Sequence, residues 1–164
     1  MAIADIQIRT WQGAYAHVFP AEGLASLETG RERREAFWRS TIQSKPARSH
    51  TLVAEEDDAV VGFASVGPDR DDPEIGELYA IYVFPQKWGA GAGRALMGEV
   101  LRHLRAEAFA EAVLWVLDDN PRARAFYERS GWSLEGGARE ETLLDTFVRE
   151  VKYRIGLGGA TDIA

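Results

Sequence analysis

Residues 78–97 read LYAIYVFPQKWGAGAGRALM, and this segment decides how the chain folds. Its apolar first part, residues 78–84, has the length and composition of a buried strand. Pro85 cannot donate to a sheet ladder and therefore marks the end of that strand. Helix-forming residues follow from Arg94 onward. The segment thus predicts a strand, a tight turn and a long helix that runs to about Phe109.

The turn holds three glycines at alternate positions, Gly89, Gly91 and Gly93. Glycine takes positive φ easily and lets a ligand approach the backbone N–H groups. The first N–H groups of a helix lack internal partners, and the helix dipole favours negative charge there. The turn therefore predicts a phosphate cradle, although a flexible loop of small residues remains an alternative. It is neither a Walker loop, because no Lys-Ser or Lys-Thr follows, nor a dinucleotide motif, because Leu96 stands where its last glycine would be.

Composition limits the possible functions. The 164 residues are 46% hydrophobic and 27% charged, as in an ordinary globular protein of one domain. A net charge of −7 disfavours general nucleic-acid binding. The absence of cysteine excludes thiolate catalysis, disulfides and cysteine metal sites, and no metal site is expected. Without a basic leader or a run of about 18 apolar residues, we expect a cytoplasmic protein that makes no membrane contact.

The rest of the chain mixes helices and strands, which predicts an α/β fold. Residues 1–18 fit both a strand and a helical stripe, and we favour a helix that ends near Pro20. The other expected elements are helices at 22–27, 31–43 and 121–130, a hairpin at 51–55 and 60–66, a solvated loop at 67–76, and strands at 111–117, 132–135, 141–144 and 147–154, the last two joined around Asp145. We expect a single domain over residues 1–155 and a flexible tail at 156–164.

Several aromatic and histidine side chains have an ambiguous role. Trp11, Tyr15, Phe37 and Trp38 could line a substrate pocket, but packing of the helices onto the sheet is the favoured interpretation. The three histidines, His17, His50 and His103, are far apart in the sequence. We expect them to be isolated and superficial.

Three motifs, taken in order, resemble the GNAT superfamily of N-acetyltransferases. They are ELYAIYVFP at 77–85, WGAGAG at 88–93, which is similar to the family's Gln/Arg-x-x-Gly-x-Gly turn, and NPRARAFYERSGW at 120–132, which is similar to its Asn-x-x-Ala-x-x-x-Tyr helix. The resemblance covers residues 51–154 well and implies the GNAT acyl-CoA N-acyltransferase fold, a mixed, mostly antiparallel central sheet flanked by helices. Trp88 departs from the pattern because the family has Gln or Arg there, and the family's usual first strand is expected to be missing or replaced.

The resemblance implies acetyl-CoA (coenzyme A) as the acyl donor and a primary amine of a small molecule or peptide as the acceptor. The pyrophosphate would lie on the N–H groups of the turn, and the pantetheine arm beside the strand that precedes it. Asn120 could bond that arm, cap its helix, or do both. The residues expected to bind the cofactor are Ile81, Tyr82, Val83, Trp88, Gly89, Ala90, Gly91, Ala92, Gly93, Arg94, Asn120, Ala123, Phe126 and Tyr127.

The expected catalytic residues are Glu77 and Tyr127. An alkyl amine with a pKa near 10.4 is almost fully protonated at neutral pH, so a base must remove a proton before or during attack. The resemblance implies that Glu77 does this through water and that Tyr127 gives a proton to the departing thiolate. Alternatively, Glu77 is a solvated acid at a strand end and Tyr127 a core tyrosine.

The acceptor and the oligomeric state are less constrained. Between residues 51 and 80 the chain carries nine acids and one base, Arg70. Acids of the loop at 67–76 could ring the acceptor entrance and favour cationic amines, or form a solubilising face. A homodimer is compatible with the resemblance. Two other classes stay open, an acyl-CoA-binding module without catalysis and a non-CoA nucleotide-binding domain, which is disfavoured because no Mg²⁺ site or ribose-reading acid is found.

Overall fold

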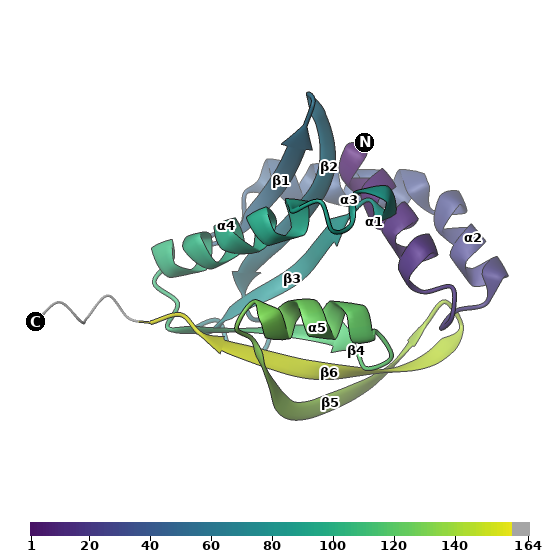
Figure 1. Cartoon of the computed structure of the whole chain (residues 1–164). Coiled ribbons are helices and arrows are strands. Elements are labelled where there is room, and N and C mark those ends of the chain that lie inside the picture. The colour runs from purple at the N-terminus through teal and green to yellow at the C-terminus, as the bar shows by residue number, and fades with distance from the viewer. Residues whose placement is uncertain (159–164) are drawn as a thin grey trace, which may run out of the picture.

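The computed structural model describes residues 1–158, which form one six-stranded sheet with helices on both faces (Figure 1). The strands are β1 (His50–Glu56), β2 (Ala59–Pro68), β3 (Gly76–Val83), β4 (Glu111–Leu117), β5 (Ser133–Leu143) and β6 (Thr146–Gly156). The helices are α1 (Ala2–Ala14), α2 (Ala21–Thr29), α3 (Arg31–Ser44), the 3-10 turn η1 (Pro85–Lys87), α4 (Ala92–Ala106) and α5 (Pro121–Arg129). The sheet order is β1-β2-β3-β4-β6-β5. Only β3 and β4 are parallel, so the predicted mixed, mostly antiparallel sheet is confirmed.

The sheet splits between its two parallel strands. The strands β3 and β4 pair only at their beginnings, from Gly76 opposite Ala112 to Leu78 opposite Leu114. Beyond Leu78 they diverge, as the ribbons in Figure 1 show. A register shift of β3 against β2 leaves Tyr79 as an extra residue at that point, and such a bulge bends a strand. The split therefore exposes one backbone edge of β3 inside the molecule.

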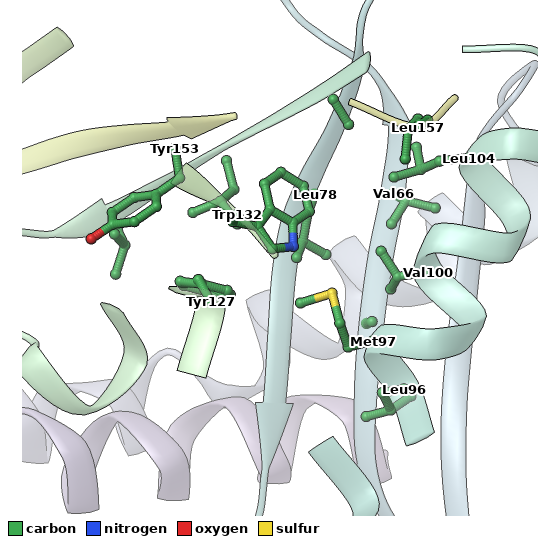
Figure 2. Close-up of a cluster of buried hydrophobic side chains, with 14 of the residues drawn as sticks. Val66, Leu78, Leu96, Met97, Val100, Leu104, Tyr127, Trp132, Tyr153 and Leu157 are labelled. Atoms are coloured by element: carbon green, nitrogen blue, oxygen red, sulfur yellow. The ribbon is translucent and has the colours of Figure 1, made fainter. Parts of the chain in front are cut away.

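The main core lies under α4 and α5 (Figure 2). The apolar stripe of α4 is buried there through Leu96, Met97, Val100 and Leu104. These side chains belong to the same cluster as Trp132, Tyr153 and Tyr127. Each fully buried Leu or Val contributes roughly 1.5–3 kcal/mol relative to an exposed position. This packing holds the start of α4 beside the end of β3.

The N-terminal helices cover the other face, and the predicted helix in residues 1–18 is confirmed. Part of α1 packs with Trp38 of α3 against Phe63 of β2. Its second half packs with α2 against Leu117 of β4 and Val148 of β6. Within the described residues β1 is the first strand of the sheet and pairs only with β2.

Two features differ from the prediction, and the expected hairpin turn is confirmed. The two strands expected at 132–135 and 141–144 are one strand, β5, because a bulge at Gly136 and Gly137 absorbs the irregularity instead of ending the strand. The turn at Leu144 and Asp145 has two positive φ angles, as a two-residue hairpin loop requires, and it confirms the hairpin. Helix α4 ends at Ala106 rather than near 109.

The chain end also differs. The expected tail at 156–164 begins too early, because Leu157 is buried and its N–H donates to the Ala110 carbonyl at 2.8 Å. Residues 159–164 lie outside the described residues. Among the helices of residues 1–158, none combines the length and the hydrophobicity needed to cross a bilayer.

Candidate active site

A cavity of about 610 Å³ opens where β3 and β4 separate. Its walls come from α1, β3, the glycine turn, α4, β4, α5 and the β5–β6 hairpin. Every residue expected to bind the cofactor or to catalyse lines it, except Ala90 and Ala92. The glycine turn and Glu77 thus line the same cavity. The part of the cavity near the glycine turn is called the cofactor end, and the part near Glu77 the acceptor end.

The glycine turn has the geometry of an anion cradle. Gly89 has φ +79° and Gly91 φ +99°, conformations that residues with a Cβ rarely adopt. A Cβ built on either would meet nothing within 4 Å, so the space above the turn is open. Within residues 1–158, unbonded backbone N–H groups cluster at this turn; they belong to Gly89, Gly91, Ala92, Gly93 and Arg94. Free donors at a helix N-terminus fit a pyrophosphate.

Trp88, the departure from the family pattern, is part of the frame of this turn. Its indole Nε1 donates to the Val83 carbonyl at 2.8 Å. The guanidinium carbon of Arg122, from the first turn of α5, lies 3.2 Å from the centroid of the Trp88 ring. Burial lowers the pKa of Arg122. No carboxylate pairs with it in the described part of the chain. The guanidinium of Arg122 therefore lies beside the cradle. Because it comes from α5 and not from the glycine turn, the sequence of the turn did not predict it.

The free edge of β3 runs along the cavity from Tyr79 to Val83. Its last carbonyl, that of Val83, already accepts bonds from Trp88 and from Thr10 Oγ1, the latter at 3.1 Å. The residues before Val83 have no partner strand on this side, since β4 has diverged. An extended chain with amide groups can pair with such an edge as a strand would.

Glu77 is buried, which excludes the solvated strand-end interpretation. Only 4% of the residue is exposed. Its carboxylate lies 3.5 Å from Arg70 Nη2 and accepts a 3.4 Å bond from the Arg70 backbone N–H. Burial raises the pKa of Glu77, and the charge of Arg70 partly opposes this rise. A carboxylate with a raised pKa is a better match for a general base near neutral pH.

Tyr127 lies on α5 with its ring buried and its side chain on the cavity wall. Its hydroxyl makes no hydrogen bond to any of residues 1–158. Burial, followed by the proximity of Tyr15 and Tyr82, raises the pKa of Tyr127. The phenol consequently keeps its proton at neutral pH and is free to donate it.

Asn120 is confirmed as a helix cap and also reaches across the cavity. Its side-chain oxygen accepts from the Ala123 N–H at 3.1 Å. Its Nδ2 donates to the Tyr15 hydroxyl at 3.3 Å, which links α5 to α1. Both halves of the amide therefore have protein partners, and a bond to pantetheine stays a prediction.

The acceptor end of the cavity was largely missed by sequence reasoning. Of the four ambiguous aromatics, Trp11 and Tyr15 line the cavity, Trp38 is in the core and Phe37 is 61% exposed. The cavity also holds three side chains that no motif marked, listed by strand as Trp115 of β4, Arg139 of β5 and Glu150 of β6. Of the nine acids between residues 51 and 80, only Glu77 lines it. The premise of an acidic ring is therefore wrong for the cavity itself.

The expectation of isolated histidines is wrong for two of them. The rings of His50 and His103 lie with centroids 4.4 Å apart, and His50 Nε2 is 2.7 Å from a Glu107 carboxylate oxygen. None of these residues lines the cavity. Within residues 1–158 no group of three or more potential metal-ligating side chains is found.

The sheet splits at its single parallel pair, and a glycine turn lies at the split. This arrangement is the GNAT acyltransferase fold that the sequence predicts. The chain belongs to the acetyltransferase (GNAT) family, whose model matches residues 6–132. Enzymes of this family use acetyl-CoA.

Individual relatives agree with this family. An uncharacterized N-acetyltransferase, YuaI, of Bacillus subtilis is 33% identical over 121 residues, covering 73% of this chain and 66% of that protein. A mycothiol acetyltransferase of Kocuria rhizophila is 37% identical over 117 residues, covering 69% of this chain and only 37% of that protein. The solved PaiA N-acetyltransferase of Thermoplasma acidophilum, in complex with coenzyme A, has a TM-score of 0.70 at 18% identity and covers 92% of this chain and 90% of that one. This last likeness concerns the fold alone.

Proposed function

We propose that this protein transfers the acetyl group of acetyl-CoA to a primary amine by direct attack. The observation that carries the proposal is that one cavity joins the open N–H groups of the glycine turn to a buried carboxylate and an unbonded phenol. The names of the relatives, all acetyltransferases, support the same reaction. Use of this donor is compatible with the cytoplasmic location expected from the sequence.

The chain's own groups would hold the donor by three kinds of contact. The N–H groups of Gly89 and of Gly91 to Arg94 would bind the pyrophosphate, since they have no other acceptor among the described residues. The free edge of β3 before Val83 would pair with the pantetheine amides. The cavity between the diverging strands would then direct the thioester toward Tyr127. When bound, acetyl-CoA supplies an activated acetyl group.

Glu77 and Tyr127 would handle the protons. Glu77, directly or through one water, takes a proton from the ammonium or from the amine as its nitrogen bonds to the acetyl carbon. An acceptor that arrives as the ammonium loses one further proton, which is released to solvent. Tyr127 gives its proton to the sulfur as the carbon–sulfur bond breaks. The products are an amide and a thiol, and the proton on Glu77 returns through solvent to the phenolate.

The test combines binding and turnover. Calorimetry with CoA should show a saturable site, and acetyl-CoA with a panel of amines should release thiol at a rate that depends on the amine. Glu77→Gln should bind CoA as wild type does while releasing little thiol. A protein that binds CoA yet acetylates no amine would be an acyl-CoA-binding module. Absence of CoA binding would reject the proposal altogether.

A further inference from the structure

Arg139 reaches from the edge of the sheet into the acceptor end of the cavity. It lies on β5, opposite Glu150 of β6, and its Nε donates to Glu150 Oε2 at 2.6 Å. Its guanidinium carbon lies 4.5 Å from the ring centroid of Trp115, which belongs to β4. Because β6 separates β5 from β4, the side chain spans β6 and ends near the middle of the sheet. The stem is thus fixed by an ion pair and by an aromatic face.

The two terminal nitrogens of the Arg139 guanidinium make no hydrogen bond to residues 1–158. Within residues 1–158, Nε is the only nitrogen of Arg139 that makes a hydrogen bond, and the second nearby acid, Glu141, also approaches Nε, at 3.7 Å. The two terminal nitrogens have no partner there. A guanidinium matches a carboxylate through two parallel N–H bonds, and a stem that is already ordered loses little freedom on binding.

The charged residues around Glu77 indicate which kind of group the terminal nitrogens of Arg139 can bind. The charged residues that line the cavity from β3, the loop before it, β5 and β6 are Arg70, Glu77, Arg139 and Glu150; the other charged lining residues, Lys87, Arg94, Arg122 and Arg129, come from η1, α4 and α5. Glu150 is committed to Arg139, and Arg70 stands 3.5 Å from Glu77. The positive charge of Arg139 lowers the pKa of Glu77, but this effect is smaller than the rise that burial causes. The nearby cation Lys152 pairs with Glu135 and does not line the cavity. Within residues 1–158 the Arg70 side chain also makes no hydrogen bond, but it is 63% exposed, against 34% for Arg139. The unmet donors that an ordered, half-buried stem holds at this end are therefore those of Arg139.

We propose that the acceptor is an amine that also carries a carboxylate, as an amino acid does, with the carboxylate on the terminal nitrogens of Arg139 and the amine at Glu77. This inference rests on the acetyl transfer proposed above and names its substrate class. It replaces the preference for cationic amines that the acidic loop suggested, because the acids of that loop, Glu77 apart, do not line the cavity.

The test compares each α-amino acid of a panel with the amine obtained by removing its carboxylate, and adds linear diamines. Thiol release from acetyl-CoA gives kcat/KM, expressed per neutral amine so that differences in amine pKa cancel. The wild type should prefer the carboxylate-bearing member of its best pair at least tenfold. Arg139→Gln should abolish this preference while CoA affinity, measured by calorimetry, stays within twofold of wild type.

Arg149→Gln is the matched control, since Arg149 lies on the same hairpin, is mostly exposed and does not line the cavity. This variant should keep the preference. Arg139→Lys keeps the charge without the fork and should retain only part of it. A wild-type enzyme that acetylates amines with no preference for a carboxylate, or prefers diamines, would overturn this inference and leave acetyl transfer standing. Failure to acetylate any amine would overturn both.

Discussion

The two ends of the cavity are built in different ways. The cofactor end is made mainly of backbone N–H groups in one contiguous turn, where Gly89 and Gly91 supply positive φ. The acceptor end is made of side chains that distant elements bring together, among them Tyr15 directly after α1, Trp115 of β4 and Arg139 of β5. Backbone donors can hold a phosphate whatever most neighbouring side chains are, whereas selectivity at the acceptor end changes with each side chain. If this contrast is right, substitutions at the two ends should produce separable defects.

The largest effect should come from Glu77 at the acceptor end. Because burial raises its pKa, its base form in the wild type is lost as pH falls through that raised value, and kcat/KM should fall on the acid side above the ordinary range for Glu, near 4.3. Glu77→Gln should lower kcat/KM by roughly 10²–10⁴ at neutral pH and recover as pH approaches the amine pKa. Profiles of both proteins against pH check this. Superimposable profiles would show that Glu77 is not the base.

Tyr127→Phe should lower kcat by about 10–10² with unchanged CoA affinity, because only the proton for the leaving sulfur is lost. The hydroxyl has no hydrogen bond to any of residues 1–158, so its removal should leave folding stability nearly unchanged. Single-turnover kinetics and thermal melts check the two statements. A large fall in melting temperature at wild-type kcat would instead make Tyr127 a structural residue.

At the cofactor end, Gly91→Val should weaken CoA binding at least tenfold, about 1.4 kcal/mol or more. Valine at φ +99° is strained, and its Cβ would enter the open space above the turn. Gly98→Val is the control, because Gly98 lies within α4 and a Cβ there also meets nothing within 4 Å, without a positive φ. Calorimetry on both variants should show a loss in the first only.

The smallest effect should come from Arg122, the cation stacked on Trp88. Arg122→Gln should weaken CoA binding by about three- to tenfold, the range of a partly exposed charge-assisted contact. Pantetheine, which carries no phosphate, should bind this variant and the wild type equally well. An equal loss for both ligands would assign Arg122 to the packing of Trp88 rather than to phosphate binding.

The same contrast explains what sequence reasoning could find. The strand, turn and α4 are local, so the pattern from Leu78 to Met97 was sufficient to predict the cradle, and together with the motif at 120–132 it predicted the family. Arg139, Glu150 and Trp115 meet only because β6 inserts between β4 and β5, a pairing that no local pattern encodes. The role of Arg122 was hidden in the same way, since its partner Trp88 precedes it by a helix and a strand. The single strand β5 was predicted as two strands, at 132–135 and 141–144, because a bulge and a loop look alike in sequence.

The most direct test of two separable ends is a parallel calorimetric titration of CoA into wild type, Gly91→Val and Glu77→Gln, each followed by thiol release at saturating acetyl-CoA. The account predicts that Gly91→Val loses CoA affinity but regains most of its turnover at saturation. It also predicts that Glu77→Gln binds CoA like the wild type and remains nearly inactive at neutral pH. Wild-type affinity in Gly91→Val, or lost CoA binding in a folded Glu77→Gln, would contradict it.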